Sequence, residues 1–345
     1  MVAKVTWQKL TLKLRNPFRL SYGTSETRQA YWLRLWDESG WGEGTIPPYY
    51  GVDHAEMEAV WRRAANHPLD FPETPSEIPA WIGDGVAPAR CALDLALHDR
   101  IAKKMAVPLY QLLGLPYPKP KASSFTISLD TPEQMALMAT QVPKFPIIKV
   151  KLGGDETDLA RLTAIRRARP DVQLWVDANA GWHMDQALAY LPDLESIGLE
   201  MLEQPLPKQD FSGMGKLQAA TSIKIVADES VQTLDDVEKL AAAGVGGINI
   251  KLMKVGGLTP ALEMIRRARA LGLGVMLGCM IETAIGVTAM AQLMGVADWL
   301  DLDAPALITN DPFDGLVLDE HFMVHIPERP GIGVILKGEK QSTQI

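Results

Sequence analysis

After residue 120 the chain repeats one pattern, in which a short apolar run is followed by a stretch of helical periodicity. Eight such runs lie between residues 121 and 311, and they read ASSFTISL, FPIIKVKL, VQLWVDAN, LEMLEQP, IKIVADES, GGINIKLM, LGVMLGCM and DWLDLD. Regular alternation of strand and helix predicts a parallel sheet, and eight units favour a closed α/β barrel over an open doubly wound sheet.

The amphipathic stretches between the runs carry helix boundary signals. Asp155 is a candidate N-cap for the helix after the second run, while Gly244 and Gly272 are candidate stops for two later helices. These residue types leave backbone groups satisfied where a helix begins or ends. We therefore expect helices, and not long loops, between the strands.

Residues 1–120 are organised differently. KVTWQKLTLKL and AYWLRLWD alternate apolar and polar residues, which predicts strands, and helical periodicity runs from about Pro88 to Leu113. The proline-rich stretch LGLPYPKPKA follows, and proline neither continues a helix nor donates to a central sheet. The sequence thus predicts a small α+β unit that ends near residue 120.

Composition excludes several classes of function. The net charge of the 345 residues is −8, so there is no basic surface for nucleic acid. No apolar run reaches the roughly 18 residues of a membrane span, and the start of the chain lacks the apolar core of a signal peptide. Two cysteines are too few for a disulfide framework. We expect a cytoplasmic protein without nucleic-acid or membrane partners.

Acidic residues end three consecutive runs: Asp177, Glu203 and Asp228, about one strand–helix unit apart. The carboxyl ends of barrel strands meet at one face, so these side chains should converge there. Three carboxylates without a cation repel one another, whereas Mg²⁺ prefers oxygen ligands and neutralises them. The alternative is that each acid merely caps the next helix.

Lysines lie on both sides of these acids. Lys149 and Lys151 are two residues apart on one strand and share its inner face, and Lys251 ends a strand across the barrel. Burial beside another cation is expected to lower a lysine pKa toward the range of a base. Alternatively, the lysines lean into solvent. Lys254 lacks a comparable position, and we expect it in a loop or at the surface.

A metal flanked by two lysines suggests a specific chemistry. Removing the proton α to a carboxylate creates an enediolate, which a metal-bound carboxylate would stabilise. A base on one face and an acid on the other invert the carbon. This arrangement predicts an epimerase or racemase.

The motifs KVK (149–151), DANAGW (177–182), EQP (203–205), ADES (227–230), NIKLMKVGG (249–257) and GCMIET (278–283) together resemble the muconate-lactonizing-enzyme subgroup of the enolase superfamily. The resemblance implies a modified TIM barrel, (β/α)7β, spanning residues 121–311. It also implies an N-terminal α+β capping domain at residues 1–120, completed by residues 312–345. Homo-oligomeric assembly is a further expectation.

The resemblance assigns roles at the strand ends. It implies Mg²⁺ on Asp177, Glu203 and Asp228. Lys151 and Lys251 are implied as the acid/base pair, with Lys149 supporting Lys151 and the substrate carboxylate. Two further polar residues, Asn179 and Glu229, are expected to orient the ligands and pair with lysine.

DLDAP (301–305) narrows the substrate. Asp301 and Asp303 share one strand face, and the pair resembles the Asp-x-Asp signature with which dipeptide epimerases hold a free amine. We therefore expect a dipeptide substrate inverted at its second residue. N-succinylamino acid racemisation, o-succinylbenzoate synthesis, muconate cycloisomerisation and a non-catalytic ligand-binding barrel remain alternatives.

The side-chain preference stays open. Gly23 occupies the place of the arginine that binds glutamate in L-Ala-D/L-Glu epimerases, and Arg19 and Arg28 lie out of register with it. The capping loops instead suit an apolar, aromatic or cationic side chain. The further candidates for substrate contact are Tyr22, Tyr50, Thr126 and Glu282.

Overall fold

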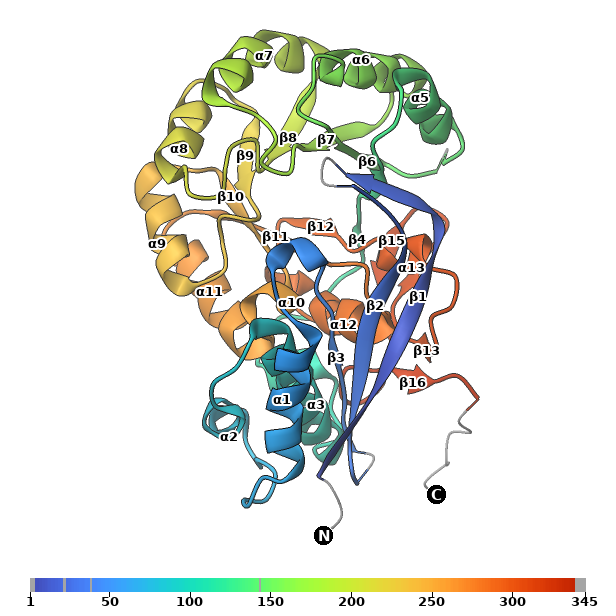
Figure 1. The fold of residues 1–345 in the computed structure, drawn as a ribbon, viewed down its shortest axis with the longest axis vertical. Helices are drawn as coiled ribbons and strands as arrows, with labels where there is room; N and C mark the ends of the chain where they lie inside the picture. The colour runs from blue at the N-terminus through green and yellow to red at the C-terminus, as the bar shows by residue number, and fades with distance from the viewer. Residues whose placement is uncertain (1–3, 21–22, 38, 143, 339–345) are drawn as a thin grey trace.

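The barrel predicted from the repeated pattern is present. The computed structural model describes residues 4–20, 23–37, 39–142 and 144–338, and Figure 1 shows a ring of strands and helices above a smaller N-terminal unit. Eight strands form one sheet in which every recorded pairing is parallel, in the order β12-β11-β10-β9-β8-β7-β6-β5. They are β5 (Phe125–Ile127), β6 (Ile147–Lys151), β7 (Gln173–Asp177), β8 (Leu199–Glu203), β9 (Lys224–Ala227), β10 (Gly247–Ile250), β11 (Gly274–Gly278) and β12 (Trp299–Asp301).

The two ends of this sheet meet. The backbone N–H of Ser124, one residue before β5, donates to the carbonyl of Leu300 in β12 over 3.0 Å. Seven helical connections join the eight strands, which is the (β/α)7β order. The helices are α5 (Pro132–Thr140), α6 (Asp158–Ala168), α7 (Met184–Ile197), α8 (Phe211–Ala219), α9 (Leu234–Ala243), α10 (Leu252–Val255), α11 (Leu258–Ala270) and α12 (Ala284–Ala291).

Alternation along the strands separates two environments. Outward-facing residues such as Val150 join the large apolar cluster between the sheet and its helices. A second cluster forms the apolar floor of the barrel, made by Ile147, Trp175, Met201, Val226 and Met276. Polar side chains therefore lie above this floor, toward the carboxyl ends of the strands.

The N-terminal unit is a three-stranded antiparallel sheet packed against helices. The sheet contains β1 (Val5–Leu20), β2 (Gly23–Leu35) and β3 (Trp41–Gly44), and the helical elements are η1 (Pro48–Tyr50), α1 (His54–Ala65), η2 (Pro75–Glu77), α2 (Ile78–Ile82), α3 (Ala87–Lys104) and α4 (Leu109–Leu112). In Figure 1 the far end of the β1–β2 pair reaches the barrel. There the N–H of Leu129, after β5, donates to the carbonyl of Arg19 over 3.1 Å.

Two local expectations were wrong. The helix expected from Pro88 to Leu113 ends at Lys104, because Ala106 has a φ of 56° and Pro108 cannot continue a helix. The N-cap of α6 is Thr157, not Asp155. Asp155 instead accepts hydrogen bonds from Thr157 and Arg161. Gly244 and Gly272 do end their helices in the left-handed conformation, as predicted.

The C-terminal residues contact both units. The pairs β13 (Phe313–Asp314) with β16 (Ile335–Leu336) and β14 (Val317–Leu318) with β15 (Met323–His325) are antiparallel, and β15 also pairs with β4 (Lys121–Ala122). The N–H of Ile332 donates to the Asp99 carboxylate of α3 over 2.7 Å. The division into domains at 1–120, 121–311 and 312–345 stays a prediction.

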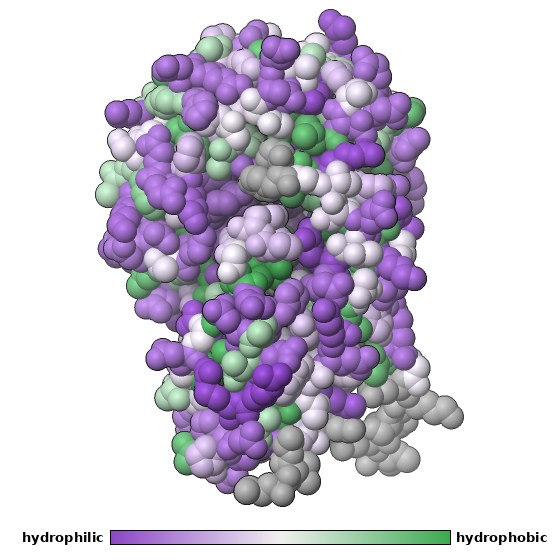
Figure 2. All heavy atoms as spheres, viewed as in Figure 1, coloured by the Kyte–Doolittle hydropathy of each residue, from purple (hydrophilic) through white to green (hydrophobic). Residues whose placement is uncertain are grey.

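Hydrophilic side chains cover most of the barrel helices in Figure 2, as expected for helices whose apolar faces are turned toward the sheet. Among the described residues, no helix is both long and apolar enough to cross a membrane.

Close packing between β3 and α3 yields a stability prediction. A Cβ on Gly42 would stand 1.8 Å from the carbonyl oxygen of Ala92, so the two elements would have to separate. We expect Gly42→Ala to lower the free energy of unfolding by about 3 kcal/mol or more, measured by urea denaturation. Gly244→Ala is the control, because its Cβ meets open space and only its φ of 82° is strained, at about 1 kcal/mol. Equal losses would contradict this account.

Candidate active site

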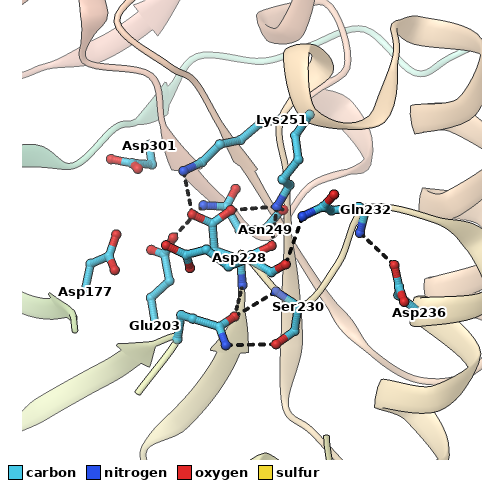
Figure 3. Close-up of polar contacts among 12 residues, drawn as sticks. Asp177, Glu203, Asp228, Ser230, Gln232, Asp236, Asn249, Lys251 and Asp301 are labelled. Carbon is cyan, nitrogen blue, oxygen red and sulfur yellow. Dashed lines mark hydrogen bonds and ion pairs between the residues drawn. The ribbon is translucent and has the colours of Figure 1, made fainter. Parts of the chain in front are cut away.

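Three carboxylates converge at the carboxyl ends of β7, β8 and β9. Asp177, Glu203 and Asp228 are buried, and each offers an oxygen within 4.8 Å of the others (Figure 3). Burial and the neighbouring carboxylates raise the pKa of Glu203 to about 7. Burial would also raise the pKa of Asp177, but Lys151 and Lys149 outweigh it and hold that pKa at about 2. The site therefore concentrates negative charge that nearby cations must balance.

Lys149 is the most heavily engaged of these cations. It is 1% exposed, and its Nζ lies 2.6 Å from Glu203 Oε2, 2.7 Å from Asp301 Oδ2 and 3.2 Å from Asp177 Oδ2. Its ammonium thus links the triad to the Asp301 side of the barrel. Asn249 also holds the Glu203 carboxylate, because its Nδ2 donates to Glu203 Oε1 over 2.8 Å.

Lys151 and Lys251 lie on opposite walls. Lys151 Nζ is 2.5 Å from Asp177 Oδ2, and Lys251 Nζ is 2.7 Å from Asp228 Oδ2. They come from β6 and the end of β10, four strands apart, which is half the circumference of an eight-stranded barrel. The two ammonium groups consequently approach one cavity from opposite sides.

The expected lowering of the lysine pKa is wrong for Lys149 and Lys251. Burial lowers the pKa of Lys251, but Asp228 and other carboxylates outweigh burial and hold it well above the usual value. Asp301, Glu203 and Asp177 do the same for Lys149. Each of these lysines lies closer to carboxylates than to another cation. Strand spacing alone does not reveal these distances.

Lys254 was also predicted wrongly. Its side chain is completely buried, with Nζ 2.6 Å from Asp228 Oδ1 and 2.9 Å from the carbonyl of Asn249. The short helix α10 turns it back beneath the strand ends. Asp228 is therefore held between two lysines, Lys251 and Lys254.

Asp301 and Asp303 form the opposite side of the cavity. Asp301 accepts from Ser124 Oγ over 2.6 Å and binds Lys149, and Lys149 lowers its pKa despite burial. Asp303 accepts from the backbone N–H of Thr126 over 2.8 Å. Burial and the charge of Asp301 raise the pKa of Asp303 to about 6. A lysine therefore neutralises Asp301, whereas no described cation contacts Asp303.

The remaining predicted residues fall around this centre. Asn179 has a φ of 44°, and its Nδ2 donates to Glu229 Oε1 over 3.2 Å, which places both beside the triad. Burial and Asp228 raise the pKa of Glu229 to about 7. Glu282 is buried close to Glu43, and both burial and Glu43 raise its pKa. The cavity lining in that loop comes instead from residues 279–281.

A cavity with about 520 Å³ of empty space, including its mouth, joins these groups. Lys149, Lys151, Lys251, Asp301, Asp303 and Thr126 line it together with Phe18, Leu20, Arg28, Pro47, Tyr49, Cys279, Met280, Ile281 and Leu307. Tyr50 is half-buried near Asp228 and Lys251 and is not among the described lining residues, whereas its neighbour Tyr49 is. Tyr22 lies outside the described residues.

Arg28 is a lining residue that sequence reasoning set aside. Counting along the chain placed it out of register with the expected arginine position at Gly23. In the structure, β2 carries it to the cavity, where it is 8% exposed. Only the path of β2 over the barrel reveals this placement.

The triad fits a hard divalent cation. All three donors are carboxylate oxygens, which suit Mg²⁺, and burial together with repulsion from Asp177 and Asp228 raises the pKa of Glu203. Asn249 and Lys254 hold two of the carboxylates from behind. Such outer contacts fix the orientation of metal ligands.

Comparisons with known proteins agree with this geometry. The model of the enolase C-terminal domain-like family matches residues 133–340. An L-Ala-D/L-amino acid epimerase of Maribacter sp. is 35% identical, over 96% of this chain and 99% of the relative. The L-Ala-D/L-Glu epimerase of Bacillus subtilis is 33% identical, over 99% of each chain. The dipeptide epimerase of Enterococcus faecalis, solved with Mg and L-Leu-L-Tyr, has a TM-score of 0.90 at 30% identity, covering 96% of this chain and 99% of that one.

The triad predicts a metal-dependent stabilisation. Millimolar Mg²⁺ should raise the Tm of the protein by several degrees, because a ligand of the folded state stabilises it. Glu203→Gln should remove most of this rise. Glu200→Gln, on the exposed side of the same strand, is the matched control and should keep it. Equal stabilisation of both variants, measured by calorimetry, would exclude Glu203 as a ligand.

Proposed function

The chain belongs to the enolase superfamily, and on that premise we propose that it is a Mg²⁺-dependent dipeptide epimerase that inverts the α-carbon of the second residue. The observation that carries the proposal is the placement of Lys151 and Lys251 on opposite walls of one cavity. A planar carbon between two such groups gains or loses a proton on either face. Epimerisation requires that symmetry.

The lysines exchange the α-proton. One lysine, in its neutral form, accepts the proton from one face, and the other, as an ammonium, donates a proton to the opposite face. When bound by Asp177, Glu203 and Asp228, Mg²⁺ supplies positive charge for the negative charge that gathers on the substrate carboxylate. Lys149 adds a fixed ammonium between the triad and Asp301. Inversion follows because the proton leaves and returns on different sides.

Asp301 and Asp303 hold the free amine of the dipeptide. Lys149 and Ser124 already contact the Asp301 carboxylate. The described contacts of the Asp303 carboxylate are with Thr126, so its negative charge is available to the substrate ammonium. An ammonium bound there extends the substrate across the cavity from the triad. The substrate is thus fixed at both ends, with its α-carbon between the lysines.

The names of the relatives differ in the second residue, so the function is proposed at the level of dipeptides. A cytoplasmic location and a homo-oligomeric state stay predictions from the sequence.

Proton exchange tests the reaction directly. Dipeptides incubated with the protein and Mg²⁺ in deuterated water should gain one deuterium at the second α-carbon and become mixtures of two epimers, measured by mass spectrometry and chiral chromatography. A broad library of L,L-dipeptides without deuterium uptake would count against the proposal. Uptake by N-succinyl amino acids alone would favour the racemase alternative.

The two lysines should be separable in the same assay. Lys151→Ala and Lys251→Ala should each lower epimerisation by about 10³-fold or more, because each removes one of two required proton carriers. One variant should still exchange the proton of the L,L-epimer, and the other that of the L,D-epimer. Lys208→Ala, at the surface, is the control. Near wild-type rates in both active-site variants would refute the two-base mechanism.

Amine binding should depend on pH. Because the pKa of Asp303 is about 6, its carboxyl is charged above that pH and increasingly neutral below it. The KM for a dipeptide should therefore rise as the pH falls through about 6 and be lowest near pH 7, where the dipeptide amine, with a pKa of about 8, is still protonated. Asp303→Asn should raise KM at pH 7 by about tenfold or more and remove the dependence below pH 7. An N-acetylated dipeptide, which lacks the ammonium, should show neither effect, and a KM unchanged in the variant would disprove the role.

A further inference from the structure

Arg28 carries a buried charge that no carboxylate in the described part of the chain neutralises. Its side chain is 8% exposed, and no described carboxylate lies within ion-pair distance of it. Its Nε lacks a hydrogen-bond partner among the described residues. Burying an unpaired charge costs free energy unless a ligand supplies the partner. A guanidinium in this state is suited to an anionic group.

Arg28 stands where two cavities adjoin. It lines the cavity of the catalytic lysines and a second cavity formed by Phe18, Leu20, Gly23, Thr24, Ser25, Pro48 and Tyr49. Both cavities share Phe18, Leu20, Arg28 and Tyr49, so a group leaving the first cavity toward the β1–β2 pair passes the guanidinium. The site thus has a side compartment with a cationic wall.

The substituents of the reacting carbon assign this compartment to one group. In the proposed epimerase reaction, the substrate carboxylate faces Asp177, Glu203 and Asp228, the peptide nitrogen leads toward Asp301 and Asp303, and the α-proton faces a lysine. The remaining substituent is the side chain of the second residue. This side chain faces the wall formed by β1, β2 and the residues before η1, and Arg28 is part of that wall.

The other cations of the lining are already committed. Lys149, Lys151 and Lys251 each contact at least one carboxylate within 2.7 Å. Arg28 is the lining cation with no such contact in the described part of the chain. We propose that Arg28 selects a carboxylate side chain at the second residue of the dipeptide, an inference that rests on the proposed epimerase function.

Two acids of the N-terminal unit do not oppose this selection. Glu26 and Asp53 are exposed and absent from both cavity linings, and Asp53 instead caps α1 by accepting from Ala55. Gly23, where the sequence resemblance would place an arginine, has a φ of 138° that disfavours any side chain. The cationic function is therefore supplied from a different strand position, five residues further along.

Substrate ranking tests the inference. We would compare kcat/KM for L-Ala-L-Glu, the neutral isostere L-Ala-L-Gln, L-Ala-L-Met and L-Ala-L-Lys, with the Mg²⁺-loaded protein. The wild type should favour L-Ala-L-Glu over L-Ala-L-Gln by about tenfold or more, because only the carboxylate pairs with Arg28. Arg28→Met should lower kcat/KM for L-Ala-L-Glu about 100-fold, mainly through KM, and leave L-Ala-L-Met within about threefold.

Charge and position are controlled separately. Arg28→Lys keeps the charge and should restore part of the preference for glutamate. Arg19→Met, on the neighbouring strand and outside both cavities, should leave the ranking unchanged. Should Arg28→Met not fold, the wild-type ranking still decides the question.

The outcomes distinguish this inference from the function beneath it. If no dipeptide is epimerised, the proposed function fails. If dipeptides are epimerised but L-Ala-L-Gln or L-Ala-L-Met is preferred, only the role of Arg28 fails. An equal loss for all four substrates in Arg28→Met would show that the residue is structural, and would also overturn the inference.

Discussion

The interaction on which the site depends is the contact of the Lys149 ammonium with three carboxylates inside the barrel. The alternating strands bring Asp177, Glu203 and Asp301 to one buried level, and these charges can remain there only if cations and hydrogen bonds compensate for lost hydration. Lys149 provides that compensation from the centre, and Lys254 provides it for Asp228 from below. Asp177 and Asp228 consequently hold Lys151 and Lys251 in place, while both lysines still line the cavity.

Much of this arrangement was predictable because strand geometry determines it. A side-chain period of two places Lys149 and Lys151 on one face, and the parallel order of the barrel places the acids of three successive strands side by side. These rules require only the sequence. They also located Asp301, which ends β12, whereas Asp303 lies beyond that strand at the N-cap of α13 (Ala304–Leu307) and lines the same cavity.

Features that depend on loops and on packing between distant segments were not predictable in this way. Lys254 was misplaced because α10 turns the chain back immediately after β10, and no period describes a four-residue helix. Arg28 was set aside because its role depends on how β2 crosses the barrel, which no local pattern encodes. The direction of the lysine pKa values was wrong for the same reason: distances to carboxylates from other strands decide it.

The path of β2 is in turn tied to the barrel through Glu43. This buried residue of β3 accepts from the Thr283 N–H over 2.8 Å, from the Thr283 hydroxyl over 2.6 Å and from the Gly286 N–H over 3.1 Å, at the start of α12. The loop before α12 lines the catalytic cavity with residues 279–281. The capping sheet that positions Arg28 and the loop that faces Lys251 are therefore anchored to each other by one carboxylate. Because the Glu43 carboxylate joins the two walls, the side compartment at Arg28 cannot change shape independently of residues 279–281.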